Sequence, residues 1–460
     1  MIKTRIESDT MGEVEVPIKA LYGAQTQRAV ENFTISGKPL PASFIHAILR
    51  IKAAAAQSNA ELECLDVMIA NLISETCERL YRDQDLMSHF PVDVFQTGSG
   101  TSSNMNANEV IAKLASRGSD ELIDPNDHVN FGQSSNDVVP TAIHISAATQ
   151  LSYHLLPALE HLVAVIDKKA CDVADYCKTG RTHLMDAMPI SFDQPLNGWA
   201  AQIRANIKNI SALQVPLQSL PQGGTAVGTG INTDPRFAKL FCTNISESVG
   251  LEFTVSENYF AQMGAQDTSV ALSGQLKTTA VSIMKIANDL RWMNSGPLAG
   301  LGEISLQALQ PGSSIMPGKV NPVIPEAAAM VAAQVIGNDA AITIGGQSGS
   351  FELNVMLPMI AYNLLESIEI LANVSYLLAD KAIATFTVNK EHLDKALYKN
   401  PILVTALNPI IGYQKAADIA KQAYREQRSV VDVAFENTEI SRADLEAILD
   451  PRKLTFGGLK

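Results

Sequence analysis

The stretch "ALSGQLKTTAVSIMKIANDLRWM" (residues 271–293) favours an α-helix along its whole length and contains no proline. A second segment of the same character, "YNLLESIEILANVSYLLADKAI", follows at residues 362–383. Both contain the alanine and leucine that have high helix propensity. Nearer the N-terminus, "PASFIHAILRIKAAAAQSNAEL" (residues 41–62) repeats apolar residues three and four positions apart, the pattern of a helix with one buried face. These segments predict a mainly α-helical protein.

Further helical segments extend that prediction to a bundle. The long ones lie at residues 138–178, 194–220, 262–295, 325–345 and 352–385. Several long helices in one chain are typical of a helical bundle. Alternating β-branched runs are confined to short pieces such as "GEVEVP" and "EFTVSE", so little sheet is expected.

The chain also divides into regions of different character. Its 460 residues are enough for about two to four domains. Beyond about residue 396 the sequence becomes charged and short-helical, which predicts a small C-terminal helical domain at residues 396–460. The rest is expected to form an N-terminal helical domain (residues 1–137) and a central helical-bundle domain (residues 138–395).

Composition limits the partners of the chain. Hydrophobic residues make up 46% and charged residues only 18%, so we expect much helix surface to be buried, in part between subunits. The net charge of −13 argues against attraction to nucleic acid or to an anionic membrane. No uninterrupted apolar run reaches the roughly 18 residues of a membrane span. An anionic substrate would therefore need a local cationic pocket.

The spacing of the cysteines and histidines bears on the cellular compartment of the protein and argues against a metal site. The five cysteines form no CxxC pair, and the eight histidines show no metal-binding spacing. The start of the chain is polar and acidic, unlike a secretory or organellar leader. We therefore expect a cytoplasmic protein without a metal site.

The segment "PGSSIMPGKVNP" (residues 311–322) interrupts the helical pattern. Its glycines allow backbone N–H groups to surround an anion, and its prolines restrict the loop. Lys319 and Asn321 supply the cation and the amide needed to hold a carboxylate, and Ser313 adds a hydroxyl. The same composition also suits an ordinary surface turn. It is not a phosphate-binding P-loop, because Val320 follows the lysine.

Other polar side chains precede or begin helices. Glu326 falls in the first turn of a predicted helix. A carboxylate there interacts favourably with the helix dipole, and this is the simpler role of Glu326 unless it has a partner. His183 in "GRTHLMDAMPISFDQ" is a candidate partner, which Glu326 would orient as a base, although a lone histidine is more often structural. The remaining candidates lie in two loops, where helix capping is their simpler role: Ser99, Thr101, Ser134, Ser135 and Asn136.

Five stretches together resemble the sequence blocks of the fumarase/aspartase superfamily, in the order in which that family has them. They are "TGSGTSSNMNANEV", "HVNFGQSSND", "GRTHLMDA", "GGTAVGTGINT" and "GSSIMPGKVNP". The similarity begins at "GAQTQRAVENF" and continues to "LNPIIGY", which covers essentially the whole chain.

Within the superfamily the chain looks most like the class II fumarate hydratases. His183 stands where aspartases have glutamine, Ser135 where they have threonine, and Gly318 where they have alanine. Val323 and Pro325 are instead reminiscent of aspartases. Aspartate ammonia-lyase or another fumarate-releasing lyase is therefore the alternative enzyme. A third alternative is a non-catalytic structural protein, similar to the lens proteins of this superfamily, but the intact catalytic set argues against it.

Three positions depart from the usual fumarase pattern. Asp124 replaces the histidine of an "HPND" motif that forms a second, surface dicarboxylate site in such families. A carboxylate there should repel an anion, so we expect that site not to function. Leu298 and Phe131 also differ from the residues usual at their positions and could alter specificity or stability.

The resemblance implies a fold, an assembly and a reaction. The fold is three largely helical domains, whose long central helices assemble four identical subunits around a twenty-helix core. Active sites are built by loops from three subunits. The reaction is the reversible, stereospecific hydration of fumarate to L-malate through an aci-carboxylate intermediate, as in the tricarboxylic acid cycle, without a cofactor.

The resemblance also implies a role for each candidate residue. Ser313 is the base that removes the carbon-bound proton, and Lys319 stabilises the charge that results. His183, oriented by Glu326, handles the water. The residues that hold the carboxylates and the water are Ser99, Thr101, Ser134, Ser135, Asn136, Thr182, Lys319 and Asn321.

Overall fold

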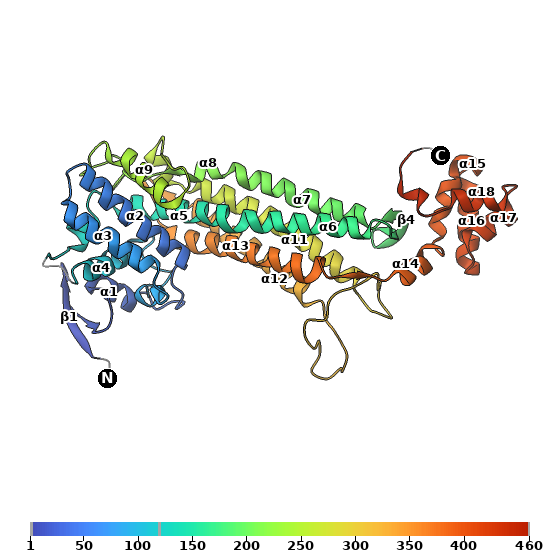
Figure 1. The fold of residues 1–460 in the computed structure, drawn as a ribbon, viewed down its shortest axis with the longest axis horizontal. Coiled ribbons are helices and arrows are strands. Elements are labelled where there is room, and N and C mark those ends of the chain that lie inside the picture. The colour runs from blue at the N-terminus through green and yellow to red at the C-terminus, as the bar shows by residue number, and fades with distance from the viewer. Residues whose placement is uncertain (1–2, 118–120, 459–460) are drawn as a thin grey trace. The chain divides into compact units, whose positions relative to one another are not determined.

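The computed structural model, which describes residues 3–117 and 121–458, is mainly α-helical as predicted (Figure 1). The chain forms two compact units. The first contains the chain up to Pro157 with Asn206–Ala280 and Val331–Ala372, and the second contains Ala158–Ala205, Val281–Met330 and the chain from Asn373 onward. The three-domain division stays a prediction.

Long helices contribute residues to both units. They are α6 (Leu156–Val173), α7 (Asp193–Ala212), α11 (Asp267–Met293), α12 (Val323–Gly346) and α13 (Leu357–Leu378). The predicted segments cover these helices, but 138–178 spans α5 (Ser135–Gln150), η3 (Leu151–Leu155) and α6, and 194–220 continues past α7 into the strand β5 (Ser219–Leu220). The segment 352–385 differs at its start, because Leu353–Asn354 is strand β9, which pairs with β8 (Gly349–Ser350) before α13 begins.

The predicted helix at residues 138–178 is wrong at its C-terminal end. Helix α6 ends at Val173, and residues Cys177–Thr182 form strand β3, antiparallel to β4 (Met185–Ser191). Gly180 and the β-branched threonines of β3 disfavour helix and favour extended backbone. The hairpin matters because it carries His183.

The first unit is built around α2 (Ala42–Glu61), which packs against α3 (Val67–Tyr81), α5 (Ser135–Gln150) and α9 (Phe237–Val249). Its apolar face is fully buried, and Ala55 has no exposed surface. The unit also contains short elements: β1 (Thr4–Asp9), β2 (Gly12–Pro17), α1 (Ala24–Asn32), α4 (Thr101–Ala115), η2 (Pro125–Val129), η3 (Leu151–Leu155), α8 (Gln214–Leu217), β5 (Ser219–Leu220), β6 (Thr254–Val255) and α10 (Tyr259–Gly264). The strands β2 and β6 correspond to the two predicted β-branched pieces.

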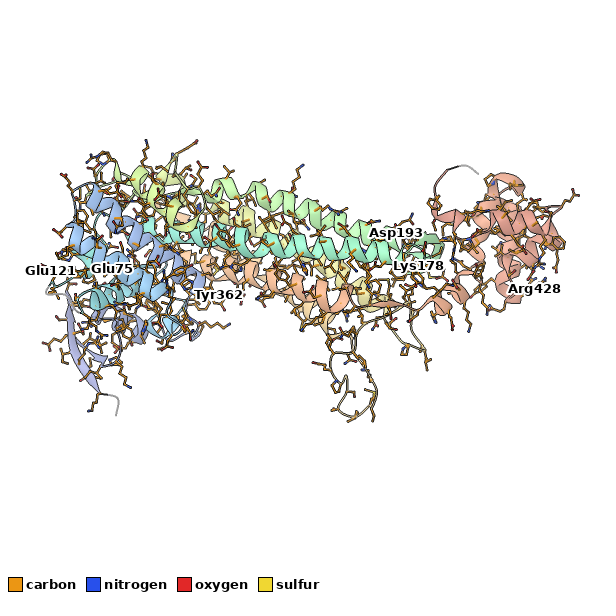
Figure 2. All side chains as sticks on the ribbon, viewed as in Figure 1. Glu75, Glu121, Lys178, Asp193, Tyr362 and Arg428 are labelled. Atoms are coloured by element: carbon orange, nitrogen blue, oxygen red, sulfur yellow. The ribbon has the colours of Figure 1, made fainter. Side chains whose placement is uncertain are left out.

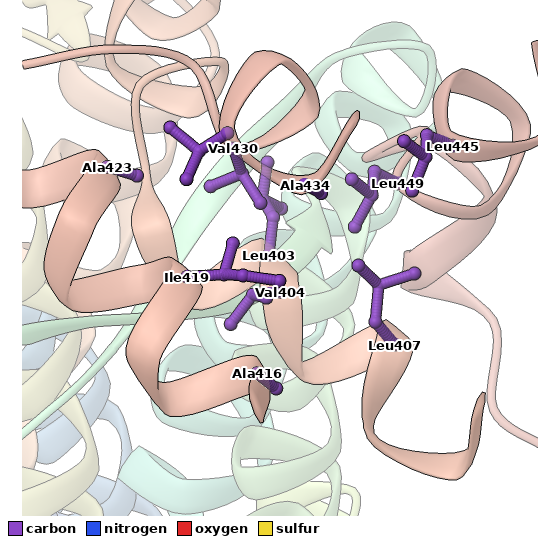
Figure 3. Close-up of a cluster of buried hydrophobic side chains, with 11 residues drawn as sticks. Leu403, Val404, Leu407, Ala416, Ile419, Ala423, Val430, Ala434, Leu445 and Leu449 are labelled. Carbon is purple, nitrogen blue, oxygen red and sulfur yellow. The ribbon is translucent and has the colours of Figure 1, made fainter. Parts of the chain in front are cut away.

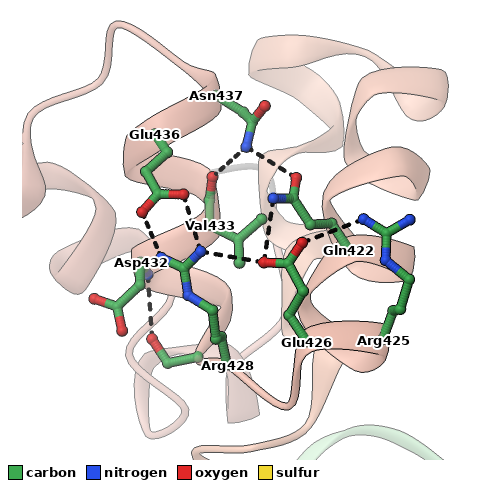
Figure 4. A network of polar contacts seen from close by, with 9 residues as sticks. Gln422, Arg425, Glu426, Arg428, Asp432, Val433, Glu436 and Asn437 are labelled. Atoms are coloured by element: carbon green, nitrogen blue, oxygen red, sulfur yellow. Dashed lines mark hydrogen bonds and ion pairs between the residues drawn. The ribbon is translucent and has the colours of Figure 1, made fainter.

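The C-terminal part of the second unit has its own apolar core. Its helices are α14 (Lys390–Leu397), α15 (Asn408–Ile411), α16 (Tyr413–Glu426), α17 (Val430–Asn437) and α18 (Arg442–Ile448). Eleven buried apolar side chains, among them Leu407, Ile419 and Leu445, pack together and come mainly from the 3-10 helix η5 (Pro401–Leu407) and from α16, α17 and α18 (Figure 3). On the outside, Arg428 bonds to Glu426 and Glu436 and so links α16 to α17 (Figure 4). Exposed ion pairs of this kind contribute little stability.

Candidate active site

The connection from α11 to α12 carries Ser313, Lys319 and Asn321, and Figure 1 shows it as irregular backbone that leaves the helix ends. The segment from Gly312 to Asn321 is closed into a loop by two hydrogen bonds. The Gly312 N–H donates to the Lys319 carbonyl at 2.8 Å, and the Asn321 side-chain amide donates to the Gly312 carbonyl at 2.7 Å. Gly318 takes a φ of +81°, which glycine adopts without strain. We call residues 306–322 the open loop, because most of its side chains are exposed.

Within the open loop, the Ser313 hydroxyl faces backbone N–H groups. Its Oγ accepts hydrogen bonds from the N–H of Ile315 at 3.2 Å and the N–H of Met316 at 3.0 Å. Donors aimed at one oxygen stabilise negative charge on that oxygen. The geometry therefore favours loss of the hydroxyl proton, which a serine that acts as a base requires.

Lys319, Asn321 and Glu326 line one open cavity of about 570 Å³. Arg291 and Trp292, from the last turn of α11, form another part of its wall. Among the described residues the Lys319 ammonium has no hydrogen-bond acceptor, so its charge is available to a ligand. Its two cations, Lys319 and Arg291, outnumber its one carboxylate, Glu326, and three asparagine amides add hydrogen-bond donors, which suits a small anion.

His183 lies at the tip of the β3–β4 hairpin and is exposed. Thr182 pairs with Met185, so His183 and Leu184 form a two-residue turn, with φ values of 55° and 62°. Left-handed backbone at residues other than glycine costs about 1–2 kcal/mol each. The hairpin must therefore be held in place by contacts elsewhere.

A buried ion cluster at the base of the hairpin provides such contacts. Lys178 (labelled in Figure 2) and Arg181, both on β3, contact opposite oxygens of Glu303, with Lys178 Nζ 2.9 Å from Oε2 and Arg181 Nη1 2.7 Å from Oε1. Burial lowers the pKa of Lys178, and the charge of Glu303 opposes that change. Removal of one partner from such a cluster leaves an uncompensated buried charge. The cluster thus fixes the strand that presents Thr182 and His183.

The first unit holds the remaining predicted residues. The hydroxyls of Ser99 and Thr101 lie 2.7 Å apart at the start of α4. Ser134 caps α5 in a capping box with Asp137, so the simpler predicted role of capping is confirmed for Ser134. The Asn136 amide donates to the Ala226 carbonyl at 2.9 Å, which ties this loop to the "GGTAVGTGINT" segment.

The predicted residues therefore form three groups along the chain. One group comprises the loops of the first unit, the second is the hairpin tip, and the third is the open loop with the start of α12. Among the described residues, no hydrogen bond or ion pair joins His183 to Glu326. Their predicted partnership stays a prediction.

Two features of the candidate site were not predicted from the sequence. Arg291 and Trp292 line the cavity, and the only signal was an arginine in the last turn of a helix, where a cation favours the helix dipole. Lys52 is fully buried on α2 beneath the loop that carries Ser135. Its signal was a lysine within the apolar run "ILRIKAAAA".

The three departures from the usual pattern have different surroundings. Asp124 caps the π-helical turn η2, where its carboxylate accepts from the N–H groups of Asn126 and Asp127. Phe131 is half-buried, and its carbonyl accepts from the Asn59 amide at 3.1 Å. Leu298 is 94% exposed. Asp124 therefore has a structural role of its own.

Two further features of the chain concern metal binding and membranes. Within residues 3–117 and 121–458, no cluster of three or more His, Cys, Asp or Glu side chains could hold a metal ion. In the same residues one helix, α12, is long and apolar enough to cross a membrane, a test that the core helix of a soluble protein also passes.

Comparison with known proteins extends over the full chain. A family described as lyase matches residues 12–337, and one described as fumarase C C-terminus matches residues 403–456. The chain is 65% identical to "Fumarate hydratase class II 2" of Pseudomonas aeruginosa over 100% of both proteins. It is 51% identical to "Fumarate hydratase class II" of Mycobacterium tuberculosis, over 97% of this chain and 95% of that one. The crystal structure of class II fumarase from Schistosoma mansoni superposes with a TM-score of 0.95 at 35% identity and covers 99% of each chain.

Proposed function

The chain belongs to the class II fumarate hydratase family, and from this premise we propose that it interconverts fumarate and L-malate at the residues described above. The similarity of the whole chain to fumarate hydratases supports this reaction. The cavity lined by Lys319, Asn321 and Glu326 supports the location. Neither a cofactor nor a metal is needed for the steps below.

Substrate binding begins with one carboxylate of the dianion at Lys319. Asn321 is well placed to assist, because its amide is already oriented by the 2.7 Å bond to Gly312. Charge-assisted hydrogen bonds are about twice as strong as neutral ones. The second carboxylate and the water fall to the neutral donors of the other groups: Ser99, Thr101, Ser134, Ser135, Asn136 and Thr182.

Proton removal is the difficult step in the direction from malate to fumarate. The Ser313 alkoxide takes a proton from the carbon beside the bound carboxylate, and the electron pair of that C–H bond moves into the carboxylate. The resulting aci-carboxylate carries one more negative charge. Lys319 binds it more strongly than the ground state, and this preorganised electrostatic stabilisation is usually the largest catalytic contribution.

Loss of water completes the reaction. The C–O bond at the neighbouring carbon breaks, the electron pair of the aci-carboxylate forms the double bond, and the departing hydroxide takes a proton from His183 to leave as water. Glu326 holds His183 in orientation and stabilises its protonated form. In the reverse direction His183 removes a proton from water, and Ser313 returns its proton to carbon.

Assembly into a homotetramer would bring the three groups together, with each site shared between subunits. The exposed apolar surface of α12 supports this, because Met330 is 68% and Ile344 57% exposed. Apolar side chains left uncovered on a core-type helix indicate a protein interface. In such an assembly α12 is buried between subunits, which also explains its membrane-like composition.

A reduced, cytoplasmic setting fits the cysteines. All five are free, and two of them, Cys64 and Cys171, are exposed. Exposed thiols persist most readily where the surroundings are reducing.

The reaction is tested by offering purified protein L-malate and L-aspartate separately and following the unsaturated product by ultraviolet absorbance. We expect absorbance to rise with malate, and no ammonia to appear with aspartate. Ammonia release from aspartate with malate inert would instead identify an aspartate ammonia-lyase and reject the proposal.

A further inference from the structure

A lysine side chain lies wholly inside the first unit. Lys52 on α2 has 0% of its surface exposed, and its neighbours Ile48 and Ile51 are equally buried. Lysine is almost never fully buried unless it is paired, because removing an ammonium from water costs several kcal/mol. A methionine would fill the same space without that cost, so the charge itself needs an explanation.

The ammonium of Lys52 is directed at one loop. Its Nζ donates to Asn130 Oδ1 at 2.8 Å and to Gln133 Oε1 at 3.1 Å. Both acceptors are neutral amides in residues 128–137, which lead into α5 and which we call the anchored loop. Among the described residues no carboxylate lies within ion-pair distance of Lys52. The Lys52 ammonium therefore binds amide oxygens of the loop and not a carboxylate.

Asn130 connects Lys52 to the candidate site through further hydrogen bonds. Its Oδ1 also accepts from the amides of Asn104 and Asn108 on α4, each at 3.2 Å. The Asn104 amide in turn donates to Ser135 Oγ at 3.0 Å. One amide oxygen thus joins α2, α4 and the hydroxyl of a predicted substrate-binding residue. Without Lys52, the Gln133 Oε1 would lose its donor and Asn130 Oδ1 its strongest one.

Asp137 holds the other end of the same loop. Its Oδ1 accepts from the Ser134 N–H at 2.9 Å, and its Oδ2 accepts from the N–H groups of Gly223 at 3.0 Å and Thr225 at 2.9 Å. Ser134–Asn136 are therefore held between a buried cation on one side and a buried carboxyl on the other.

We propose that Lys52 is a positioning residue that fixes Ser134–Asn136 in the geometry needed to bind the substrate dianion. The inference rests on the proposed function only in that these residues bind a dicarboxylate. Lys52 touches neither substrate nor reacting atoms. Its removal therefore weakens binding of substrate and transition state alike and leaves the chemical step intact.

The charge of Lys52 is also sensitive to pH. Burial lowers the pKa of Lys52 to about 7, while Asp137, which faces it from α5, opposes that fall. The other titratable group that acts on it is Cys77 of α3, whose pKa burial raises to about 12, so that thiol is neutral. Below pH 7 the lysine is charged and its hydrogen bonds are strongest. Above pH 7 they weaken to those of a neutral amine.

The experiment compares Lys52→Met with Ala55→Gly in the full-length protein. Ala55→Gly lies on the same buried helix and costs about 1 kcal/mol without touching the loop. We expect Lys52→Met to raise the KM for malate about 10- to 100-fold, from the loss of charge-assisted hydrogen bonds, with kcat near the wild-type value. The KM of the wild type should increase between pH 6 and pH 8, as Lys52 loses its charge, and the KM of Lys52→Met should lack this increase. Ala55→Gly should keep both the wild-type KM and its increase with pH.

Gln133→Ala provides a second, milder variant in case Lys52→Met does not fold. It removes one acceptor of the ammonium and should raise KM several-fold. In the double variant the two effects should be less than additive, because both remove the Lys52–Gln133 contact, although Gln133→Ala also removes the bonds from its amide to the carbonyls of Val129 and Phe131. An unchanged KM in either single variant, or a fall in kcat with KM unchanged, overturns the proposal and leaves Lys52 with a structural role only.

Failure of the proposed function would be seen separately. If the wild-type protein converts neither malate nor fumarate, the reaction is wrong, and amide hydrogen exchange then decides the role of Lys52. Faster exchange confined to residues 130–137 in Lys52→Met, and absent in Ala55→Gly, supports positioning. Equal exchange in the two variants overturns it.

Discussion

The anchored loop (residues 128–137) and the open loop (residues 306–322) have similar polar compositions but opposite surroundings. The anchored loop is held by Lys52 of α2, by Asn104 of α4 and by its own capping box. The open loop is held mainly by bonds within itself, such as that from Gly312 to Lys319. Its lysine is exposed, whereas the lysine of the anchored loop's network is completely buried.

The contrast separates two ways of preparing polar groups for a ligand. Groups in the anchored loop are fixed by the interior of the chain before any substrate arrives, which limits the entropy lost on binding. The open loop instead offers the ammonium of Lys319, which has no partner among the described residues, and the Ser313 hydroxyl, which backbone N–H groups orient. Substitutions in the open loop should therefore reduce activity alone, whereas substitutions beneath the anchored loop should also affect folding.

The strongest test of this contrast is Ser313→Ala. We expect turnover to fall by about 10³-fold or more. A positioned base contributes about 10²–10⁴-fold to the rate, and in the variant only water could take the proton. The free energy of unfolding should change by less than about 0.5 kcal/mol, because most side chains of the loop are exposed. Turnover of malate and denaturant unfolding, measured on the same preparation, check both parts.

Ser314→Ala is the matched control for Ser313→Ala. Ser314 is adjacent and exposed, and we expect the variant to retain most of its activity. If both variants lost turnover equally, the loop would tolerate no substitution at either serine, and the assignment of Ser313 as the base would be rejected.

Lys319→Met should have the next largest effect. Loss of a preorganised cation at the aci-carboxylate typically costs about 10²–10³-fold in rate. Unlike Lys52→Met, it should lower kcat as well as kcat/KM, because its interaction strengthens in the transition state. Steady-state kinetics on both variants makes the comparison direct. A change in KM alone for Lys319→Met would place this lysine with the positioning residues instead.

The two loops also show what the sequence can and cannot reveal. Composition and periodicity predicted α12 within two residues at each end, and capping chemistry predicted the role of Ser134. The β3–β4 hairpin was missed, because it is held by Glu303, which lies more than a hundred residues away along the chain. Lys52 was missed for the same reason. Local propensity is encoded in neighbouring residues, whereas these contacts depend on distant ones.

Asp137→Asn should have the smallest effect and tests the anchored loop through pH. Burial raises the pKa of Asp137 to about 6, against its three N–H donors and Lys52. Between about pH 4 and pH 6 the folded state then binds a proton that the unfolded state has lost, so the contribution of Asp137 to stability falls as pH rises through that window. The stability of the wild type relative to Asp137→Asn should accordingly fall by about 2–3 kcal/mol from pH 4 to pH 7, in denaturant unfolding at fixed protein concentration. A difference that stays constant over that range would mean that the carboxyl is ionised throughout, and that the N–H groups and Lys52 outweigh burial. In that case the loop would be held by a buried carboxylate that stays charged over this pH range, and only Lys52 would remain to make its hold depend on pH.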